Sequence, residues 1–531
     1  MLQKIKVIIL GFVLLCAAIN AFATQGLTQS AIASQHPLAT QAGKEILKQG
    51  GNAFDAAVAM SAMLAVVEPY DSGLGGGGFW LLHLENEKEG HQDIVIDGRE
   101  TAPKAAYEKM FVTDSGRLKV RLITQGALSA AIPGEPAALA YINKHYGKLS
   151  LAVCLRPAIL VAKEGFEINE EYRAAILARK KLISSNPAIR NIFMPKGVIP
   201  KVGMRIRQPD LAETLSILAQ EGHDGFYKGK VAEKLLKHVQ AGGGIWSKSD
   251  LEEYQIKVRE PLIGTYHDLK ITTVGLPSAG GIALLTALNI LEQFEMDPLS
   301  EADRDHLIIE SLRRAYCDRA LYLGDPDFIQ APVEKLISKT HGMMWRDTID
   351  LNKKTESTSL QCGVQAPVGQ QSTHFSILDE EGNRVGATLS INHAFGSGFV
   401  PVGTGVVLNN EMDDFAIAAS IENAFGLIGH QANLIQPGKR PLSSMTPTFI
   451  ESDLGIGVLG SQGGSRIPSM LLLAILDAKT GALPESWVRI KRFHHQYLPD
   501  VVNYEANAFD VPMQKALRIR GHALEPTGSP Y

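Results

Sequence analysis

Two serines at opposite ends of a predicted β-hairpin are the first residues of this 531-residue chain whose spacing indicates chemistry. Residues 373–378 and 384–391 are rich in β-forming side chains and flank a polar turn, which predicts an antiparallel hairpin. Pairing across that turn places Ser372 opposite either Ser390 or Ile391. Two hydroxyl groups that are distant in sequence are therefore expected to be neighbours.

The expected chemistry is nucleophilic attack by a serine hydroxyl, which is weak until a base accepts its proton. If the peptide bond before Ser372 were broken, the new α-amino group, with a reference pKa of about 7.7–8.0, would suit that task near neutral pH. Ser390 would hold the nucleophile in position, with Asn392 close by. The alternative is an ordinary hairpin with serines on its solvent face, and the spacing by itself favours that alternative.

A series of motifs along the rest of the chain changes this balance. They are the glycine run 73–78, DGRE at 97–100, PGEP at 133–136, QSTHFS at 371–376, LNNEMDDF at 408–415, KRPLSSM at 439–445 and GSQGGSR at 460–466. In this order they resemble the γ-glutamyltranspeptidase family, also called glutathione hydrolases, within the N-terminal-nucleophile hydrolase superfamily. The resemblance covers nearly the whole chain after its first residues.

The resemblance implies self-cleavage between Gln371 and Ser372, followed by use of Ser372 as the nucleophile. Ser390 matches the supporting hydroxyl. Gly463 and Gly464 match the pair whose backbone N–H groups form the oxyanion hole, a role that glycine suits because the backbone can approach closely.

The resemblance also implies a pocket for a γ-glutamyl head. Arg99 matches the arginine that binds the α-carboxylate, with help from Ser443 and Ser444. The matched groups that receive the α-ammonium are Asn392, Glu411 and Asp414. A head that carries both charges needs a cation on one side and carboxylates on the other. Taken singly, each match has an ordinary alternative, such as a surface ion pair for Arg99 or a helix cap for Asp414.

The implied reaction is acyl transfer through a γ-glutamyl ester on Ser372, from glutathione or its conjugates to water, an amino acid or a peptide. No metal or organic cofactor is implied, and we assign His374 and the pair at 494–495 to structure, because no third ligand has convincing metal spacing. One rival is a β-lactam (cephalosporin or glutaryl) acylase of the same superfamily. The other is an exported homologue that does not mature and is inactive.

Three departures from the family pattern are apparent. Threonine is usual where Ser372 and Ser390 stand, and serine lacks the methyl that restricts χ1, so slower maturation is expected. Phe425 replaces a tyrosine found in the lid loop of many bacterial members. Relatives also continue beyond Tyr531 through a further strand. We therefore expect an unpaired edge in the sheet that carries the nucleophile, unless residues 509–530 fold back to replace that strand.

The elements that would position these residues are consistent with an α/β protein. The run 53–67 is almost wholly small or apolar, so it predicts a buried helix. The glycine run before residues 79–84 is followed by a strand pattern, which favours close backbone packing over a phosphate loop. Further strands or helices are predicted at 37–47, 94–97, 135–146, 151–163, 208–220 and 277–294. Residues 353–370 are polar and without periodicity, so they predict an exposed loop.

The resemblance gives these elements an architecture: a four-layer αββα sandwich, with two stacked, mainly antiparallel sheets between helical layers. A large subunit, 24–371, and a small subunit, 372–531, are expected to form one intertwined domain.

The N-terminus resembles a secretory signal peptide. Lys4 and Lys6 precede an apolar run over 7–18, and Ala21-Phe22-Ala23 fits a small-x-small cleavage site. We therefore expect a signal peptide at 1–23, export to the periplasm or the medium, and no membrane attachment after cleavage. An uncleaved membrane anchor is the alternative, although the run is short for a span.

Composition and cysteine content exclude some further classes. The formal net charge is −4 and no basic stripe interleaved with aromatics is present, so nucleic acid is not an expected partner. Cys154, Cys317 and Cys362 remain after signal cleavage, and their spacing predicts neither a disulfide framework nor a zinc site. They are expected to be buried apolar residues.

Overall fold

The computed structural model describes residues 29–86, 90–362, 371–416 and 431–528. The predicted signal peptide and Phe425 lie outside these ranges. In the described part of the chain, no helix is both long enough and apolar enough to cross a membrane.

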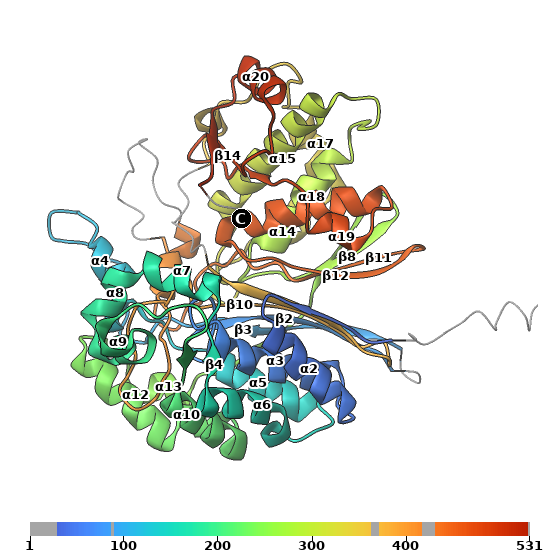
Figure 1. The fold of residues 1–531 in the computed structure, drawn as a ribbon. Coiled ribbons are helices and arrows are strands. Elements are labelled where there is room, and N and C mark those ends of the chain that lie inside the picture. Colours follow the sequence, from blue (N-terminus) through green and yellow to red (C-terminus); the bar gives the residue numbers. More distant parts are fainter. Residues whose placement is uncertain (1–28, 87–89, 363–370, 417–430, 529–531) are drawn as a thin grey trace, which may run out of the picture.

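The first sheet joins strands from both ends of the sequence. Its order is β1 (Ala31–Ser34), β9 (Thr373–Leu378), β10 (Arg384–Ser390), β2 (Gly77–Leu84), β3 (Gln92–Gly98) and β6 (Lys257–Arg259). Every neighbouring pair is antiparallel. The predicted hairpin, β9–β10, is therefore confirmed, and it lies between β1 and β2, two strands from the first hundred residues (Figure 1).

The second sheet also combines segments from before and after residue 371. It runs in the order β12 (Gly455–Leu459), β11 (Thr448–Ser452), β8 (Leu269–Thr273) and β7 (Leu262–Tyr266), again antiparallel. Its apolar side chains share one core with those of the first sheet, including Phe79 and Leu81 from β2 and Phe449 from β11. The two sheets are thus stacked face to face.

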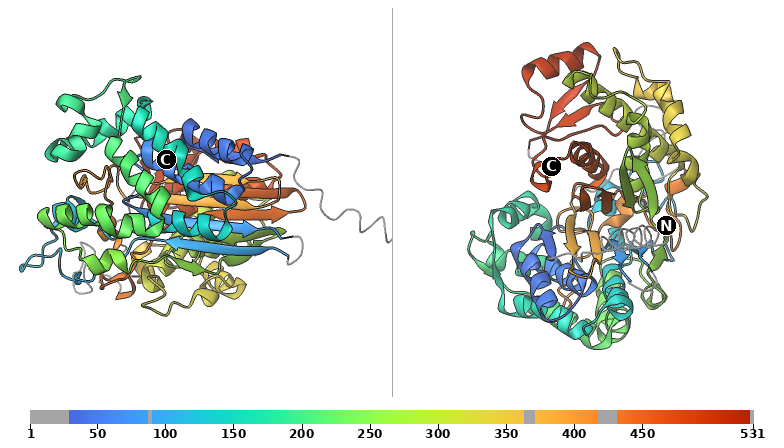
Figure 2. Two further views of the ribbon diagram at one scale, coloured as in Figure 1. Left: turned by 90° about the horizontal axis from the view of Figure 1, so that it is seen from below. Right: turned by 90° about the vertical axis from the view of Figure 1, so that its right-hand side faces the viewer.

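Helices cover the outer faces of both sheets, as the two views in Figure 2 show. On the first sheet lie α2 (Pro37–Lys48), α3 (Ala53–Val67), α5 (Glu135–Tyr146) and α6 (Leu151–Glu164). Over the second lie α14 (Gly280–Leu291) and α18 (Ile467–Lys479), with α15 (Glu301–Tyr322) and α17 (Lys339–Arg346) packed against α14. The expected four-layer αββα sandwich is confirmed.

Smaller elements complete the described part. The helices are α4 (Val120–Thr124), α7 (Glu170–Ala178), α8 (Lys180–Ser185), α9 (Pro187–Phe193), α10 (Pro209–Glu221), α11 (His223–Tyr227), α12 (Gly229–Ala241), α13 (Lys248–Glu252), α16 (Val333–Leu336), α19 (Pro484–Trp487) and α20 (Val511–Ile519). The strands are β4 (Phe166–Glu167), β5 (Arg205–Ile206), β13 (Phe493–His494), β14 (Val502–Tyr504) and β15 (Leu524–Pro526).

Helix α3 shows how the central layers are held. It begins with a capping box, in which the Asn52 side chain accepts from the backbone N–H of Asp55 and the Asp55 carboxylate accepts from that of Asn52. Every residue of the helix is buried, as an all-round apolar sequence predicts.

The glycine run lets β2 approach its neighbours closely. A Cβ at Gly76 would collide with the carbonyl oxygen of Ser390, and one at Gly78 would lie 2.5 Å from that of Thr388. The backbone packing that was predicted is therefore confirmed, and it holds the end of β10 where the two predicted hydroxyls meet.

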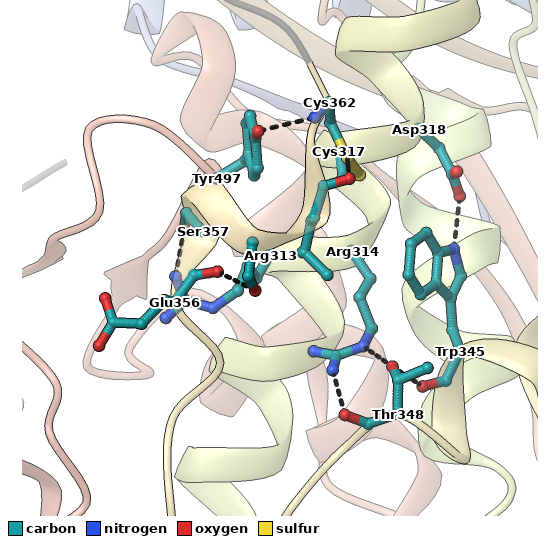
Figure 3. Close-up of a disulfide and its surroundings, with 12 residues drawn as sticks. Arg313, Arg314, Cys317, Asp318, Trp345, Thr348, Glu356, Ser357, Cys362 and Tyr497 are labelled. Carbon is teal, nitrogen blue, oxygen red and sulfur yellow. Dashed lines mark hydrogen bonds between the residues drawn. A yellow bond between two sulfur atoms is a disulfide. The ribbon is translucent and has the colours of Figure 1, made fainter. Parts of the chain in front are cut away.

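One pair of cysteines corrects the sequence-based expectation. Cys317 in α15 and Cys362 form a disulfide with Cα atoms 5.1 Å apart (Figure 3), whereas Cys154 is free and buried as expected. The signal that could have indicated it is the predicted signal peptide, because disulfides persist in the oxidising compartments to which such a peptide directs a chain.

The segment before Cys362 is likewise not simply an exposed loop. Residues 357–360 form a short 3₁₀ helix, and Ser357 is fully buried. The side chain of Ser357 accepts a hydrogen bond from Arg313 of α15, and its backbone N–H donates to Asp500 at 3.0 Å. The other residues of 353–361 are exposed or partly exposed, as predicted, and residues 363–370 lie outside the described ranges.

The predicted unpaired edge concerned the sheet that carries the nucleophile, and among the described residues that sheet ends at β1 and β6, each with one neighbouring strand. Strand β9 has β1 on one side and β10 on the other. Near the C-terminal end of the described residues, α20 and β15 pack onto the molecule, with Met513 and Leu517 buried in the core beside the second sheet.

Candidate active site

The hairpin brings Ser372 and Ser390 together. Leu389 pairs with Thr373, so the next pair along the ladder is Ser390 with Ser372, the first of the two predicted registers. Their side chains are 3% and 5% exposed. The alternative of serines on a solvent face is therefore wrong: the second sheet and its connecting loops cover this end of the hairpin.

Ser390 is bonded to the peptide carbonyl that precedes Ser372. Its Oγ donates to the carbonyl oxygen of Gln371 at 2.9 Å and accepts from the backbone N–H of Asn392 at 2.8 Å. The N–H of Gln371 donates to the carbonyl of Asn392 at 3.2 Å. These bonds fix the plane of the Gln371 carbonyl and polarise it, next to a serine hydroxyl.

The residues after Ser372 are engaged elsewhere. Thr373 Oγ1 donates to Glu68 Oε2 at 2.9 Å, and burial of that carboxyl raises its pKa to about 7. The ring of His374 bonds to Thr388 Oγ1 at 2.9 Å and Ser376 Oγ at 3.1 Å, and burial lowers its pKa to about 3. His374 thus has structural partners within the sheet.

Arg99 lies directly after β3 and is almost completely buried, at 1% exposure. Its Nη1 is 3.0 Å from Glu411 Oε2 and 3.2 Å from Glu100 Oε2, and its Nη2 is 2.5 Å from Asp414 Oδ2. Its Nε donates to the carbonyl of Pro441 at 3.1 Å. A surface ion pair is therefore excluded for Arg99.

The electrostatics of this cluster are dominated by burial and by an excess of carboxylates. Burial raises the pKa of Glu100 to about 7 and raises that of Glu411 well above its usual range. Burial acts to lower the pKa of Arg99, but Glu411, Glu100 and Asp414 outweigh it, so the guanidinium pKa is raised. The cluster holds one guanidinium against three carboxyl groups.

Two serines and two glycines approach from the second sheet and from the turn before α18. Ser443 and Ser444 lie in the loop before β11, and Ser443 Oγ accepts from the N–H of Met445 at 3.1 Å. Gly463 and Gly464 have φ values of 116° and 59°, in the left-handed region that favours glycine. Within the described ranges, neither glycine N–H donates to a protein acceptor, so both remain free to stabilise an anion.

These residues surround one cavity. It is lined by Arg99, Gln371, Ser372, Ser390, Asn392, Glu411, Asp414, Ser443, Ser444, Met445 and Gly464. The structure thus brings together the predicted site residues, with Gly463 adjoining the wall rather than lining it. The cavity volume is about 20 Å³, enough for a water molecule but far below that of a typical ligand pocket. Gln371 is part of the wall, so the uncut chain occupies its own site.

Three contributors were missed at the level of sequence. Glu100 lies in the DGRE motif, for which the resemblance implies no role at this position, and Met445 lines the cavity. Arg319 of α15 donates from Nη2 to Ser444 Oγ at 3.3 Å. Its position far from the other motifs gave no signal, because only the fold brings α15 to this loop.

A second cluster, apart from the cavity, has the composition of a metal site. His306, Glu310 and His522 present nitrogen and oxygen atoms to one another within 4.8 Å. These groups already have partners: the two imidazoles share a hydrogen bond of 2.8 Å, and Glu310 pairs with Arg313 and Arg314. The cluster is therefore a buried polar network, and the two guanidinium groups oppose binding of a cation.

The stacked antiparallel sheets between helical layers, with a serine at the head of a central strand, define an N-terminal-nucleophile hydrolase fold. The sequence model described as Gamma-glutamyltranspeptidase matches residues 39–530, so the chain belongs to the gamma-glutamyltranspeptidase family and is an enzyme.

Known proteins agree with this assignment. The glutathione hydrolase proenzyme of Pseudomonas sp. (strain A14) is 37% identical over 528 residues, covering 98% of this chain and 91% of the relative. That of Escherichia coli (strain K12) is 37% identical over 502 residues, covering 93% and 86%. Among solved structures, the cephalosporin acylase from Bacillus halodurans superposes with a TM-score of 0.80 at 27% identity, covering 95% of this chain and 92% of that one. The Helicobacter pylori gamma-glutamyltranspeptidase superposes with a TM-score of 0.59 at 36% identity, covering 61% and 93%.

Proposed function

We propose that this chain is the precursor of a γ-glutamyltransferase and glutathione hydrolase that cuts itself before Ser372. The observation that carries the proposal is the hydrogen bond of 2.9 Å from Ser390 to the carbonyl of Gln371, made beside a buried cluster of Arg99 with carboxylates. One site then serves two acyl transfers, the first on the chain itself and the second on a substrate.

In the first transfer, Ser372 Oγ adds to the carbonyl carbon of Gln371 while Ser390 donates to the carbonyl oxygen. The C–N bond breaks, which leaves Gln371 as an ester on Ser372 and frees the α-amino group. Water then hydrolyses the ester, giving a new carboxylate on Gln371 and restoring the Ser372 hydroxyl. The products are the large subunit, 24–371, and the small subunit, 372–531, which share both sheets.

In the second transfer, the α-amino group of Ser372 accepts the hydroxyl proton as Oγ attacks the γ-carbonyl of glutathione or a conjugate. The N–H groups of Gly463 and Gly464 stabilise the oxyanion. The proton passes to the leaving amine, and a γ-glutamyl ester remains. Water, an amino acid or a peptide then takes the acyl group.

The γ-glutamyl head is held by opposed charges. Its α-carboxylate lies between Arg99 and the hydroxyls of Ser443 and Ser444. Its α-ammonium is received by the carboxylates of Glu411 and Asp414 together with Asn392. Asn392 donates through Nδ2 to Asn410 at 2.9 Å, while its Oδ1 has no partner among the described residues and is available to an ammonium group.

A β-lactam acylase is the second candidate, because the cephalosporin acylase structure covers nearly the whole chain. A glutaryl group has a carboxylate but no α-ammonium, so it would leave the carboxylates near Arg99 without their partner. Comparing hydrolysis of a γ-glutamyl anilide with that of a glutaryl anilide separates the two functions. A preference for the glutaryl compound would overturn the proposal.

Maturation and export belong to the same proposal. A signal peptide at 1–23 would direct the chain to the periplasm or the medium, where the Cys317–Cys362 disulfide is stable. A denaturing gel of purified protein should show two bands, with the smaller fragment starting at Ser372. A single band without γ-glutamyl anilide hydrolysis would instead identify a homologue that does not mature.

A further inference from the structure

A second buried guanidinium lies next to the cavity, behind one of the serines that line it. Arg319 belongs to α15, the helix that carries Cys317, and only 5% of it is exposed. Its Nη2 donates to Ser444 Oγ at 3.3 Å, and Ser444 lines the cavity whereas Arg319 does not. Arg319 therefore reaches a bound molecule indirectly, and its hydrogen bond to Ser444 is one such route.

The hydrogen bond determines what the Ser444 hydroxyl can do. A serine hydroxyl has one proton to donate and lone pairs that accept, whereas a guanidinium only donates. Because Arg319 occupies a lone pair of Ser444 Oγ, the hydroxyl proton is left for another acceptor. The hydroxyl proton of Ser443 is left available in the same way, because its Oγ accepts from the N–H of Met445 at 3.1 Å. Both hydroxyls are thus prepared to donate into the cavity.

The carboxyl groups beside the cavity outnumber the single guanidinium of Arg99. Glu100, Glu411 and Asp414 all lie within 3.2 Å of Arg99. A substrate carboxylate entering this cluster would add a fourth acidic group around one guanidinium. The α-ammonium offsets part of that excess at Glu411 and Asp414, and a positive charge behind Ser444 offsets it on the side where the carboxylate is proposed to bind.

We propose that Arg319 is a positioning residue for substrate recognition: it orients Ser444 as a hydrogen-bond donor to the α-carboxylate and places a second positive charge behind that group. This inference rests on the proposed γ-glutamyl function. It predicts an effect on binding of the carboxylate, with little effect on self-cleavage or on the chemistry at Ser372.

The test compares KM and kcat for a γ-glutamyl anilide in Arg319→Gln, Arg319→Lys and the wild type. Arg304→Gln is the matched control, because Arg304 lies on the same helix and donates to the carbonyl of Leu299, away from the cavity. Arg319→Gln should raise KM about tenfold, as expected for a lost charge-assisted contact, with kcat within about threefold. Arg319→Lys keeps the charge but not the fork of donors, so its KM should lie between that of Arg319→Gln and that of the wild type.

Two further comparisons separate positioning from general support of the fold. A 4-aminobutanoyl anilide keeps the ammonium but lacks the α-carboxylate, so the wild type and Arg319→Gln should hydrolyse it equally. The double variant Arg319→Gln/Ser444→Ala should have a KM no higher than that of whichever single variant has the higher KM. An equal loss on both anilides, a fully additive double variant or an unchanged KM would overturn the inference.

The outcome stays interpretable if a variant folds poorly. If Arg319→Gln does not split into two bands, the same comparisons are made with Arg319→Lys, for which an unchanged KM overturns the inference. Failure of the proposed function is distinct, because the wild type itself would then remain uncut or leave the γ-glutamyl anilide intact.

Discussion

The hydroxyl of Ser390 donates a hydrogen bond of 2.9 Å to the carbonyl oxygen of Gln371, the residue that immediately precedes Ser372. Ser390 Oγ in turn accepts from the backbone N–H of Asn392 at 2.8 Å, so the Ser390 proton is committed to the Gln371 carbonyl. Developing negative charge on that carbonyl would be stabilised without rearrangement of the site. The uncut chain is thus arranged for attack at the bond that the family resemblance marks.

Self-cleavage should depend on Ser372 and not on its neighbour. Ser372→Ala should remain one chain because it removes the hydroxyl that attacks Gln371. Thr373→Ala should still split, since the Thr373 hydroxyl is bonded to Glu68. Denaturing gels followed over time, with N-terminal sequencing of the small fragment, provide the measurement. A fragment that starts anywhere other than Ser372 would refute this assignment.

Removing the Ser390 hydroxyl should slow self-cleavage without changing the position at which the chain is cut. Loss of one donor to a developing oxyanion typically costs about 10²–10³ in rate, and we expect the self-cleavage rate of Ser390→Ala to fall by a factor of that order. Ser390→Thr keeps the hydroxyl and serves as the control, so it should split at about the rate of the wild type. Equal splitting rates for Ser390→Ala and the wild type would show that the observed hydrogen bond has no part in the reaction.

The hairpin could be predicted because its signals are local. Alternating strands and a polar turn fix the register to within one residue, and the structure selected Ser390 over Ile391 as the partner of Ser372. The contacts of Arg99 could not be predicted in this way. Its partners Glu411 and Asp414 are more than three hundred positions away, and only the tertiary fold brings them together.

The disulfide and Arg319 were missed for the same physical reason. Both depend on where α15 lies relative to loops that come much later in the chain, and no periodic pattern encodes that placement. Family resemblance supplied the remaining site residues. It could not supply the disulfide or Arg319, because neither belongs to a motif whose role the resemblance implies.

Substitution of Arg99 should weaken use of the γ-glutamyl head while self-cleavage continues. Arg99→Gln removes the cation proposed to bind the α-carboxylate and should lower kcat/KM for a γ-glutamyl anilide about ten- to a hundredfold, or about 1.5–3 kcal/mol. The raised pKa of Glu100, about 7, lets that carboxyl be protonated near neutral pH, which limits the cost of losing its partner. Asp414→Asn should act in the same direction through the ammonium. Unchanged kcat/KM in both variants would exclude this pocket.

The disulfide should stabilise the chain without joining the two fragments. Both cysteines precede residue 371, so reducing and non-reducing gels of the mature protein should show the same separation of fragments. The bond links positions 45 residues apart, and its removal should lower the unfolding free energy by roughly 2–4 kcal/mol. Urea unfolding of Cys317→Ser/Cys362→Ser in the uncut Ser372→Ala background measures this, with reduced Ser372→Ala as the control. A midpoint equal to that of the oxidised parent would contradict the prediction.

Acid should destabilise the protein through buried neutral histidines such as His374. Burial lowers the pKa of His374 from 6.5 to about 3, so below pH 6.5 the unfolded chain binds a proton that the folded state does not. The stabilisation is therefore fully present above pH 6.5 and is lost as pH falls, by up to about 1.4 kcal/mol per pH unit for one histidine, or about 2 kcal/mol by pH 5. His374→Gln can retain hydrogen bonds to its neighbours but does not titrate, so its stability should fall less steeply between pH 7 and pH 5 than that of the parent. Urea unfolding at several pH values in the Ser372→Ala background gives the dependence of unfolding free energy on pH for both proteins. His145 is exposed, so His145→Gln serves as the control and should show the same pH dependence as the parent. If His374→Gln and its parent lose stability in parallel as the pH is lowered, His374 is not one of the groups responsible.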